Sequence, residues 1–396
     1  MEAWLLEGLK AIGRFFLHPA VYMFFISSFL VGYWRVRRER KEFSFKVYDI
    51  LYETRTSLFT GVSIGLLLSL LTIGVGLVLS KASLTVIALW TVCFALLLQY
   101  RYLSAAYSVG IAIFFFMFVP KLQTGMPFAD KLLADTEGTS LTALAFLLSF
   151  LLFAEGFLIT RRAVGGSTPR ILKGKRGLTI GMHVCKRLWI VPLFVLVPGD
   201  GVKELFAWWP VISVDSHTFS LFLVPFGIGF SNKTKGMLPS KAIFYTGRRV
   251  TGLSLLVFVL ALISLWLPSI AIAAAGIAML GRFTITIRGR IEDEKEPPYF
   301  SVQKAGLMIL DILPGSAAEE MDLQPGEIIA KVNGIAPETV RDFYTALQHQ
   351  GAFCKMEVID VNGELRLAQR AVYAGDHHEL GVLFVRQDGD RSTEAV

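Results

Sequence analysis

Long apolar runs separated by short polar segments fill the first 290 residues of the chain. A bilayer core about 30 Å thick is crossed by about 20 apolar residues in helical form. Clear runs of this kind cover residues 15–34, 57–79, 82–98, 102–119 and 139–159, and less regular ones follow at 188–209 and 216–231. This pattern predicts a polytopic α-helical membrane body.

The last apolar stretch, residues 250–281, is interrupted by Pro268 and Ser269. At ~1.5 Å per residue it is too long for one untilted crossing, yet long enough for two short ones. We therefore predict a tight helical hairpin, which brings the total to eight or nine spans, with a single crossing as the alternative. Residues 2–14 predict either an amphipathic helix at the membrane interface or an extension of the first span.

The spacing of hydrophobic positions changes after an acidic segment at 291–298, which we expect to be a linker. Short apolar runs bounded by turn residues predict strands, and helical spacing predicts one longer helix. We expect an α+β domain over residues 299–386 and a polar tail at 387–396. Within that domain the pattern predicts a helix at 340–349 and strands at 307–310, 328–332, 354–360, 364–372 and 380–385.

The sign of the net charge also changes near residue 290, where the hydrophobic pattern changes. Residues 1–290 hold 30 Lys and Arg against 13 Asp and Glu, whereas residues 291–396 hold 9 against 19. The basic residues form clusters between apolar runs, at 35–55, 161–187 and 233–249. Such clusters are typical of short cytoplasmic loops facing anionic lipid. They place the N-terminus outside and, if 250–281 is a hairpin, the C-terminal domain in the cytoplasm. We expect no nucleic-acid partner.

Few residues of the body are candidates for chemistry. Glu155 lies near the end of its span, and an ion pair with Arg161 or Arg162 explains it better than catalysis does. His18 is next to Pro19 without an evident partner, so we interpret it as structural. Glycines such as those at 61 and 65 are typical of close helix packing.

The cysteines and the C-terminal histidines do not form a recognisable site. Cys93, Cys185 and Cys354 are far apart and lack metal-ligand spacing, which indicates unpaired thiols. His377-His378-Glu379 lacks the spacing by which one helical face presents two zinc ligands. We therefore expect no catalytic residue, no metal site and no cofactor.

Four linked motifs in the C-terminal part resemble the bacterial PDZ family in order and spacing. They are Gly306-Leu307-Met308-Ile309, Leu313-Pro314-Gly315-Ser316-Ala317-Ala318, Leu323-Gln324-Pro325-Gly326-Glu327-Ile328-Ile329 and Val332-Asn333-Gly334. Family members usually have Gly where Asp322 stands and Asp where Glu327 stands. The resemblance implies a scaffold that binds an extended peptide as an added strand and holds its carboxylate in a loop of backbone amides.

By the same resemblance, the groove would lie between the strand at 307–310 and the helix at 340–347. Two loops compete for the carboxylate: Lys304–Gly306 before that strand, or, in a permuted arrangement, the segment that begins at Leu380. Phe343 and Leu347 are as readily explained as core residues. The implied peptide-binding residues are Gly306, Leu307, Met308, Ile309, Leu310, Phe343, Leu347, Leu380, Gly381 and Val382.

The whole chain resembles the MinJ-type family of division-site proteins. The resemblance is carried by Phe15-Phe16-Leu17-His18-Pro19, the basic run Arg35-Val36-Arg37-Arg38-Glu39-Arg40-Lys41, the many-span body and the terminal PDZ domain. It implies a non-enzymatic membrane adaptor, enriched at septa and poles among the divisome membrane proteins. The adaptor would link a DivIVA-like polar scaffold to a MinD-like ATPase and, through it, to MinC.

Two functions of other classes remain open from the residues alone. One is a PDZ-bearing intramembrane protease or its regulator, and the other is a transporter with a regulatory PDZ domain. The first would need a catalytic pair in the spans, and the second a polar constellation at mid-membrane.

Overall fold

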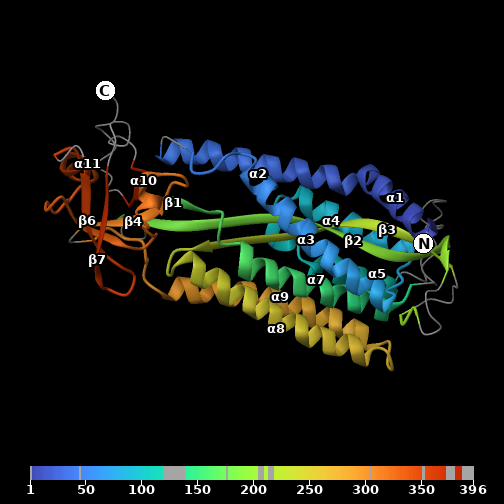
Figure 1. Cartoon of the computed structure of the whole chain (residues 1–396). Helices are drawn as coiled ribbons and strands as arrows, with labels where there is room; N and C mark the ends of the chain where they lie inside the picture. Colours follow the sequence, from blue (N-terminus) through green and yellow to red (C-terminus); the bar gives the residue numbers. More distant parts are fainter. Residues whose placement is uncertain are drawn as a thin grey trace.

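The protein is described here by a computed structural model covering residues 2–43, 46–118, 139–174, 177–203, 209–212, 218–303, 306–349, 353–371 and 380–385. The loop at 120–138 and the polar tail expected at 387–396 lie outside these residues. Figure 1 shows an elongated molecule with a helical body and a sheet domain at one end. The N-terminus lies at the end of the body farthest from that domain.

The described part of the body contains apolar helices of two lengths. Four of them, α3, α7, α8 and α9, are long and apolar enough to cross a membrane, and the bent pair α1 and α2 is a fifth candidate. α4 and α5 cover predicted spans but have only 16 and 14 residues. The helices are α1 (Glu2–Leu17), α2 (Pro19–Phe43), α3 (Tyr52–Val75), α4 (Lys81–Leu96), α5 (Ala105–Phe118), α7 (Leu141–Arg162), α8 (Pro239–Ile263) and α9 (Ile270–Lys295), with the 3-10 turn η1 (Tyr100–Tyr102) between α4 and α5.

The helical hairpin predicted at 250–281 is confirmed. α8 and α9 lie side by side and are joined by a turn at residues 264–269 (Figure 1). Both helices continue past the apolar stretch into polar residues, so they are longer than predicted. α9 ends only at Lys295, and most of the segment expected to be a linker at 291–298 is therefore helical.

The prediction of helical spans at 188–209 and 216–231 is wrong, because residues 188–203 and 218–231 are strands. β2 (Thr179–Lys203) and β3 (Thr218–Thr234) pair as a long antiparallel ribbon, and β1 (Ser167–Lys173) joins it at one end. Both runs are rich in β-branched and aromatic residues, which favour strands. The first run also carries two internal prolines and the second run one, and each proline would cost about 3 kcal/mol in a helix interior. Pro192 and Pro225 face each other in register.

Two glycines of α3 allow it to approach β2 closely. A Cβ atom at Gly61 would lie 2.2 Å from the carbonyl oxygen of Ile190, and one at Gly65 would lie 2.2 Å from that of Pro192. Only a residue without a side chain fits such an approach. The glycines therefore permit close packing as predicted, although the partner is a strand rather than a helix.

Polar side chains of α3 also form hydrogen bonds with backbone groups of β2 on the edge that does not face β3. The backbone N–H of Phe194 donates to Ser69 Oγ (2.9 Å), and Thr72 Oγ1 donates to the Phe194 carbonyl oxygen (2.8 Å). Within a membrane, strand backbone is tolerated where the protein itself covers it and supplies its hydrogen bonds. These contacts explain how a two-stranded ribbon persists among the helices.

The C-terminal domain confirms the predicted strands and helix to within two residues at each end. Its five-stranded sheet has the order β7-β6-β5-β4-β8. The strands are β4 (Leu307–Ile312), β5 (Ile328–Val332), β6 (Phe353–Ile359), β7 (Leu365–Ala371) and β8 (Val382–Phe384), and the helices are α10 (Ala317–Glu320) and α11 (Val340–Gln348). Asp322, at the position where glycine was expected, has a φ of 54°.

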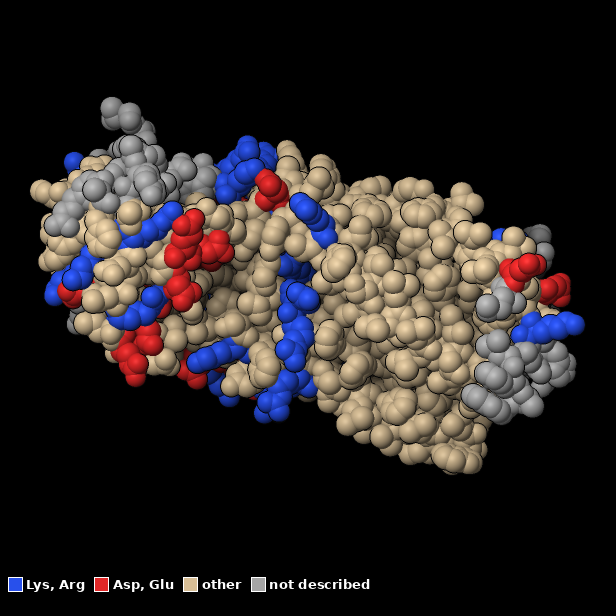
Figure 2. Space-filling model, in the orientation of Figure 1, with Lys and Arg blue, Asp and Glu red and all other residues tan. Residues whose placement is uncertain are grey.

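Charged side chains are sharply segregated along the molecule. Figure 2 shows a broad uncharged zone on the body and a band of Lys and Arg between that zone and the C-terminal domain. The band lies where α2, α7 and α9 end and α8 begins (Figure 1). The basic clusters at 35–55, 161–187 and 233–249 thus lie toward one end of the body, as the sequence predicts.

Candidate functional site

The side chains of β4 divide between two apolar clusters. Successive residues of a strand point to opposite faces. Leu307 and Ile309 pack inside the C-terminal domain with Phe343 of α11. Met308 and Leu310 point the other way and join an apolar cluster that includes residues of the body. The strand at 307–310 is therefore covered on both faces.

β4 is also paired along both of its edges. It pairs with β5 at Leu307 and Met308, and with β8 between Ile309 and Ile312. A peptide cannot be added beside β4 in this arrangement. β8 lies at one edge of the sheet, and it directly follows Leu380-Gly381. β7 has the other outer edge, but only β8 directly follows the loop that the permuted alternative names.

The side chains expected to form a groove are packed against each other. The Phe343 ring lies 4.9 Å from that of Phe384, and neither Phe343 nor Leu347 is more than 1% exposed. Of the ten implied peptide-binding residues, Gly306 is half-buried and the other nine are buried. Lys304 and Ala305, of the first candidate loop, lie outside the described residues.

A docking surface joins the C-terminal domain to the body. We define it by Phe43, Val47, Gly181 and His183 of the body and by Phe300, Met308, Leu310, Leu383 and Val385 of the domain. The Gly181 N–H donates to the Phe300 carbonyl oxygen (2.8 Å), and His183 Nε2 lies 2.9 Å from the Leu310 carbonyl oxygen. A carbonyl only accepts, so His183 donates through Nε2.

Sequence reasoning missed this docking surface, although a signal for it was present. The run Leu307-Met308-Ile309-Leu310 is apolar at every position, which is typical of a strand covered on both faces. We interpreted Met308 and Leu310 as part of a peptide groove instead. Their partners in the body come from distant parts of the chain, so no local pattern predicts the contact.

Asp311 brings an ionisable group into the same region. Its side chain is buried, Oδ1 accepts the Ile312 N–H (2.9 Å), and Oδ2 has no hydrogen-bond partner among the described residues. Burial is the main cause that raises the pKa of Asp311 from 3.8 to about 7, with a smaller contribution from the nearby carboxylate of Glu39. The docked domain therefore holds a carboxyl that titrates near neutral pH.

Glu155 has other partners than those predicted. It is fully buried, its Oε1 lies 2.8 Å from Nε of Arg282, and its Oε2 accepts from Ser104 Oγ at 2.5 Å. The prediction of a pair with Arg161 or Arg162 is wrong, because those residues lie about 9–10 Å further along α7. α9 packs against α7 and supplies the cation instead.

His18 lies at the break between α1 and α2, where the two helices bend by 50°. Its Nδ1 accepts the backbone N–H of Ala20 at 3.2 Å, near the start of α2. This contact fits the structural role that we assigned to His18. The N-terminal segment that includes residues 2–14 therefore forms a helix of its own, α1, which packs on the β2–β3 ribbon.

Groups for metal or thiol chemistry are not gathered in the described ranges. No three His, Cys, Asp or Glu residues lie close enough there to hold a metal ion. Cys93 is exposed and free, and Cys185 and Cys354 are buried and free. The motif His377-His378-Glu379 lies outside the described residues.

Long apolar helices, a basic band and a docked sheet domain together define a membrane protein with a globular C-terminal domain. The chain is 40% identical over 395 residues to the cell division topological determinant MinJ of Bacillus subtilis, covering 99% of this chain and 98% of that relative. It is 24% identical over 371 residues to a probable cell division topological determinant MinJ of Lacticaseibacillus paracasei, covering 89% and 92%. No protein-family model and no solved structure matches the chain. The chain belongs to the family of MinJ cell division topological determinants.

Proposed function

We propose that this protein is a non-enzymatic membrane adaptor for division-site selection. It links a DivIVA-like polar scaffold to a MinD-like ATPase and, through it, to MinC, and so restricts septum formation to mid-cell. The observation that carries this proposal is the 40% identity to a cell division topological determinant over nearly the full length of both chains.

The proposed topology has the C-terminal domain in the cytoplasm and the N-terminus outside. The band of Lys and Arg beside the C-terminal domain supports it, because cytoplasmic segments next to the membrane are enriched in these residues. A C-terminal fluorescent fusion tests both topology and site. The fusion partner is green fluorescent protein, which matures poorly outside the cytoplasm. Signal at septa and poles supports the proposal, and an even membrane signal contradicts the division role. A fusion that is inserted in the membrane but not fluorescent contradicts the topology.

We further propose that the C-terminal domain is a PDZ domain that binds a partner peptide along β8. The four sequence motifs and the position of β8 at the sheet edge support this assignment. A peptide there would pair with the outer backbone edge of β8. Because Phe343 packs on Phe384, peptide side chains would enter only where α11 moves away from β8.

A matched pair of glycine variants tests the peptide site. Gly381 has a φ of 82°, and a Cβ atom there would lie 2.2 Å from Ser316 Cβ. Gly363 has a φ of 87° and nothing within 4 Å of such an atom. We expect Gly381→Ala to weaken capture of one partner by the full chain and Gly363→Ala to leave it unchanged. Equal capture by both variants, at equal melting temperatures, would exclude the loop at Leu380-Gly381 as the docking site.

Truncation is a less informative test of this domain. Removal of residues 297–396 would expose the body side of the docking surface, which includes Phe43 and Val47. Loss of partner capture by such a truncation would then reflect the exposed apolar patch as readily as the missing peptide site. The point variants leave the docking surface covered.

A further inference from the structure

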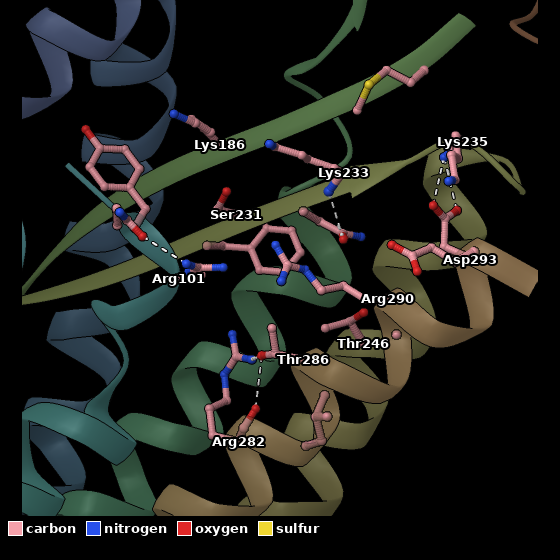
Figure 3. Close-up of a pocket in the computed structure, with 18 of the residues that line it drawn as sticks. Arg101, Lys186, Ser231, Lys233, Lys235, Thr246, Arg282, Thr286, Arg290 and Asp293 are labelled. Carbon is pink, nitrogen blue, oxygen red and sulfur yellow. Dashed lines mark hydrogen bonds between the residues drawn. The ribbon is translucent and has the colours of Figure 1, made fainter. Parts of the chain in front are cut away.

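A cavity of ≈ 640 Å³ opens in the basic band, between η1, the ribbon of β2 and β3, and the helices α8 and α9 (Figure 3). This volume is within the range of small-molecule sites, about 300–1,000 Å³. Six cations line the cavity, against two carboxylates, Asp293 and Glu294. The cations are Arg101, Lys186, Lys233, Lys235, Arg282 and Arg290.

The two carboxylates offset only part of this positive charge. Asp293 accepts the backbone N–H groups of Lys235 and Gly236 at 2.9–3.1 Å, so both of its oxygens are occupied. Glu294 is exposed. Of the six cations, Arg282 is neutralised by Glu155, which lies outside the cavity wall.

The remaining cations have spare donors. Lys186, Lys233, Lys235 and Arg290 form no ion pair with any residue in the described ranges. Arg101 donates to Gln99, but its Nε is buried and has no hydrogen-bond partner in the same ranges. Figure 3 shows Arg101 and Arg290 reaching toward the interior from opposite walls, with Lys233 on a third side.

Such a cluster is electrostatically unfavourable without an anion. Like charges repel more strongly where water is partly excluded, and a bound anion relieves that cost. Guanidinium and ammonium groups converging from several walls match the oxygens of a phosphate group. The chemistry of the cavity is therefore that of a phosphate-binding site.

The position of the cavity favours a lipid over a soluble phosphate compound. Its Lys and Arg residues belong to the basic region between the uncharged zone of the body and the C-terminal domain (Figure 2), where phospholipid headgroups would meet a membrane-inserted chain. Leu98, Phe230 and Ile285 add apolar surface to its wall. Basic pockets between membrane helices on the cytoplasmic side are suited to anionic headgroups. We propose that this cavity binds the phosphate of an anionic phospholipid headgroup.

The test compares two double variants that remove the same charge from the band. Lys233→Gln/Arg290→Gln removes two cavity cations, whereas Lys241→Gln/Arg248→Gln removes two exposed cations of α8 that do not line the cavity. The full chain is purified in detergent, and its retained lipid is measured by native mass spectrometry. Binding is then titrated with phosphatidylglycerol, phosphatidylcholine and inorganic phosphate.

We expect the wild type and the α8 variant to retain phosphatidylglycerol and to bind it far better than phosphatidylcholine. The cavity variant should bind it at least about tenfold more weakly, because it lacks two of the cations that would attract the headgroup. Arg290→Lys, which keeps the charge, should bind nearly as well as wild type. Equal loss in both double variants would overturn the proposal by assigning binding to the whole band. Binding of inorganic phosphate by a protein that retains no lipid would overturn the assignment to a lipid.

Discussion

The buried pair of Glu155 and Arg282 gives the most direct test of how the helices of the body are held together. Glu155 is fully buried and the Arg282 side chain is 3% exposed, with 2.8 Å between Oε1 and Nε. We consider the single variants Glu155→Leu and Arg282→Met and the double variant. Each replacement keeps roughly the volume of the original side chain while removing its charge.

The expected cost of each single variant follows from the burial of its partner. Removing one member of a buried ion pair leaves an uncompensated charge and costs about 3–5 kcal/mol. Removing both members leaves no buried charge, and such a replacement is often nearly neutral. In the double variant Ser104 and Thr286 each lose one side-chain partner, for about 1 kcal/mol each. The double variant should therefore be more stable than either single variant.

The free energy of unfolding can be measured by denaturing titration in mixed micelles, followed by tryptophan fluorescence. Arg249→Met is the control, because Arg249 pairs with Glu292 where both side chains are about one-third exposed. Breaking that pair should cost less than about 1 kcal/mol. Additive effects of Glu155→Leu and Arg282→Met in the double variant would refute the coupling. So would a cost of the single variants no larger than that of the control.

Three further predictions concern other contacts. Gly181→Leu should separate the C-terminal domain from the body, because a Cβ atom there would lie 2.4 Å from Leu310 Cδ1. The separation should raise the rate of proteolysis in the segment before β4. An unchanged rate of proteolysis would contradict this prediction. The folded protein keeps the Asp311 carboxyl protonated up to about pH 7, whereas the unfolded chain ionises it near 3.8, so wild type should lose stability as pH rises between these values. Asp311→Asn should abolish that loss, and melting curves from pH 5 to 8 that stay parallel for the two proteins contradict the assignment. Gly65→Leu should destabilise the body by about 1–3 kcal/mol through its clash with Pro192, whereas Gly74→Leu, which meets nothing within 4 Å, should not.

The sequence by itself determined the two-part organisation of this protein. Runs of about 20 apolar residues mark segments buried in lipid or protein, and the turn at Pro268 and Ser269 separated α8 from α9. Short apolar runs bounded by turn residues were enough to place the strands of the C-terminal domain. These features are local: each depends on residues within one segment, so it can be predicted from that segment alone.

Only the tertiary structure decided the conformation of 188–209 and 216–231 and the partners of the buried groups. Hydropathy reports that a segment is buried, but by itself it does not distinguish a buried strand from a buried helix. β2 is stable as a strand because β3 and α3 supply its hydrogen bonds, and Glu155 is neutralised by a cation 127 residues away. Likewise, the apolar run at 307–310 indicates a strand covered on both faces, but it does not say whether a peptide groove or the body covers them. Which one forms depends on what packs against each face, and that is a property of the assembled fold.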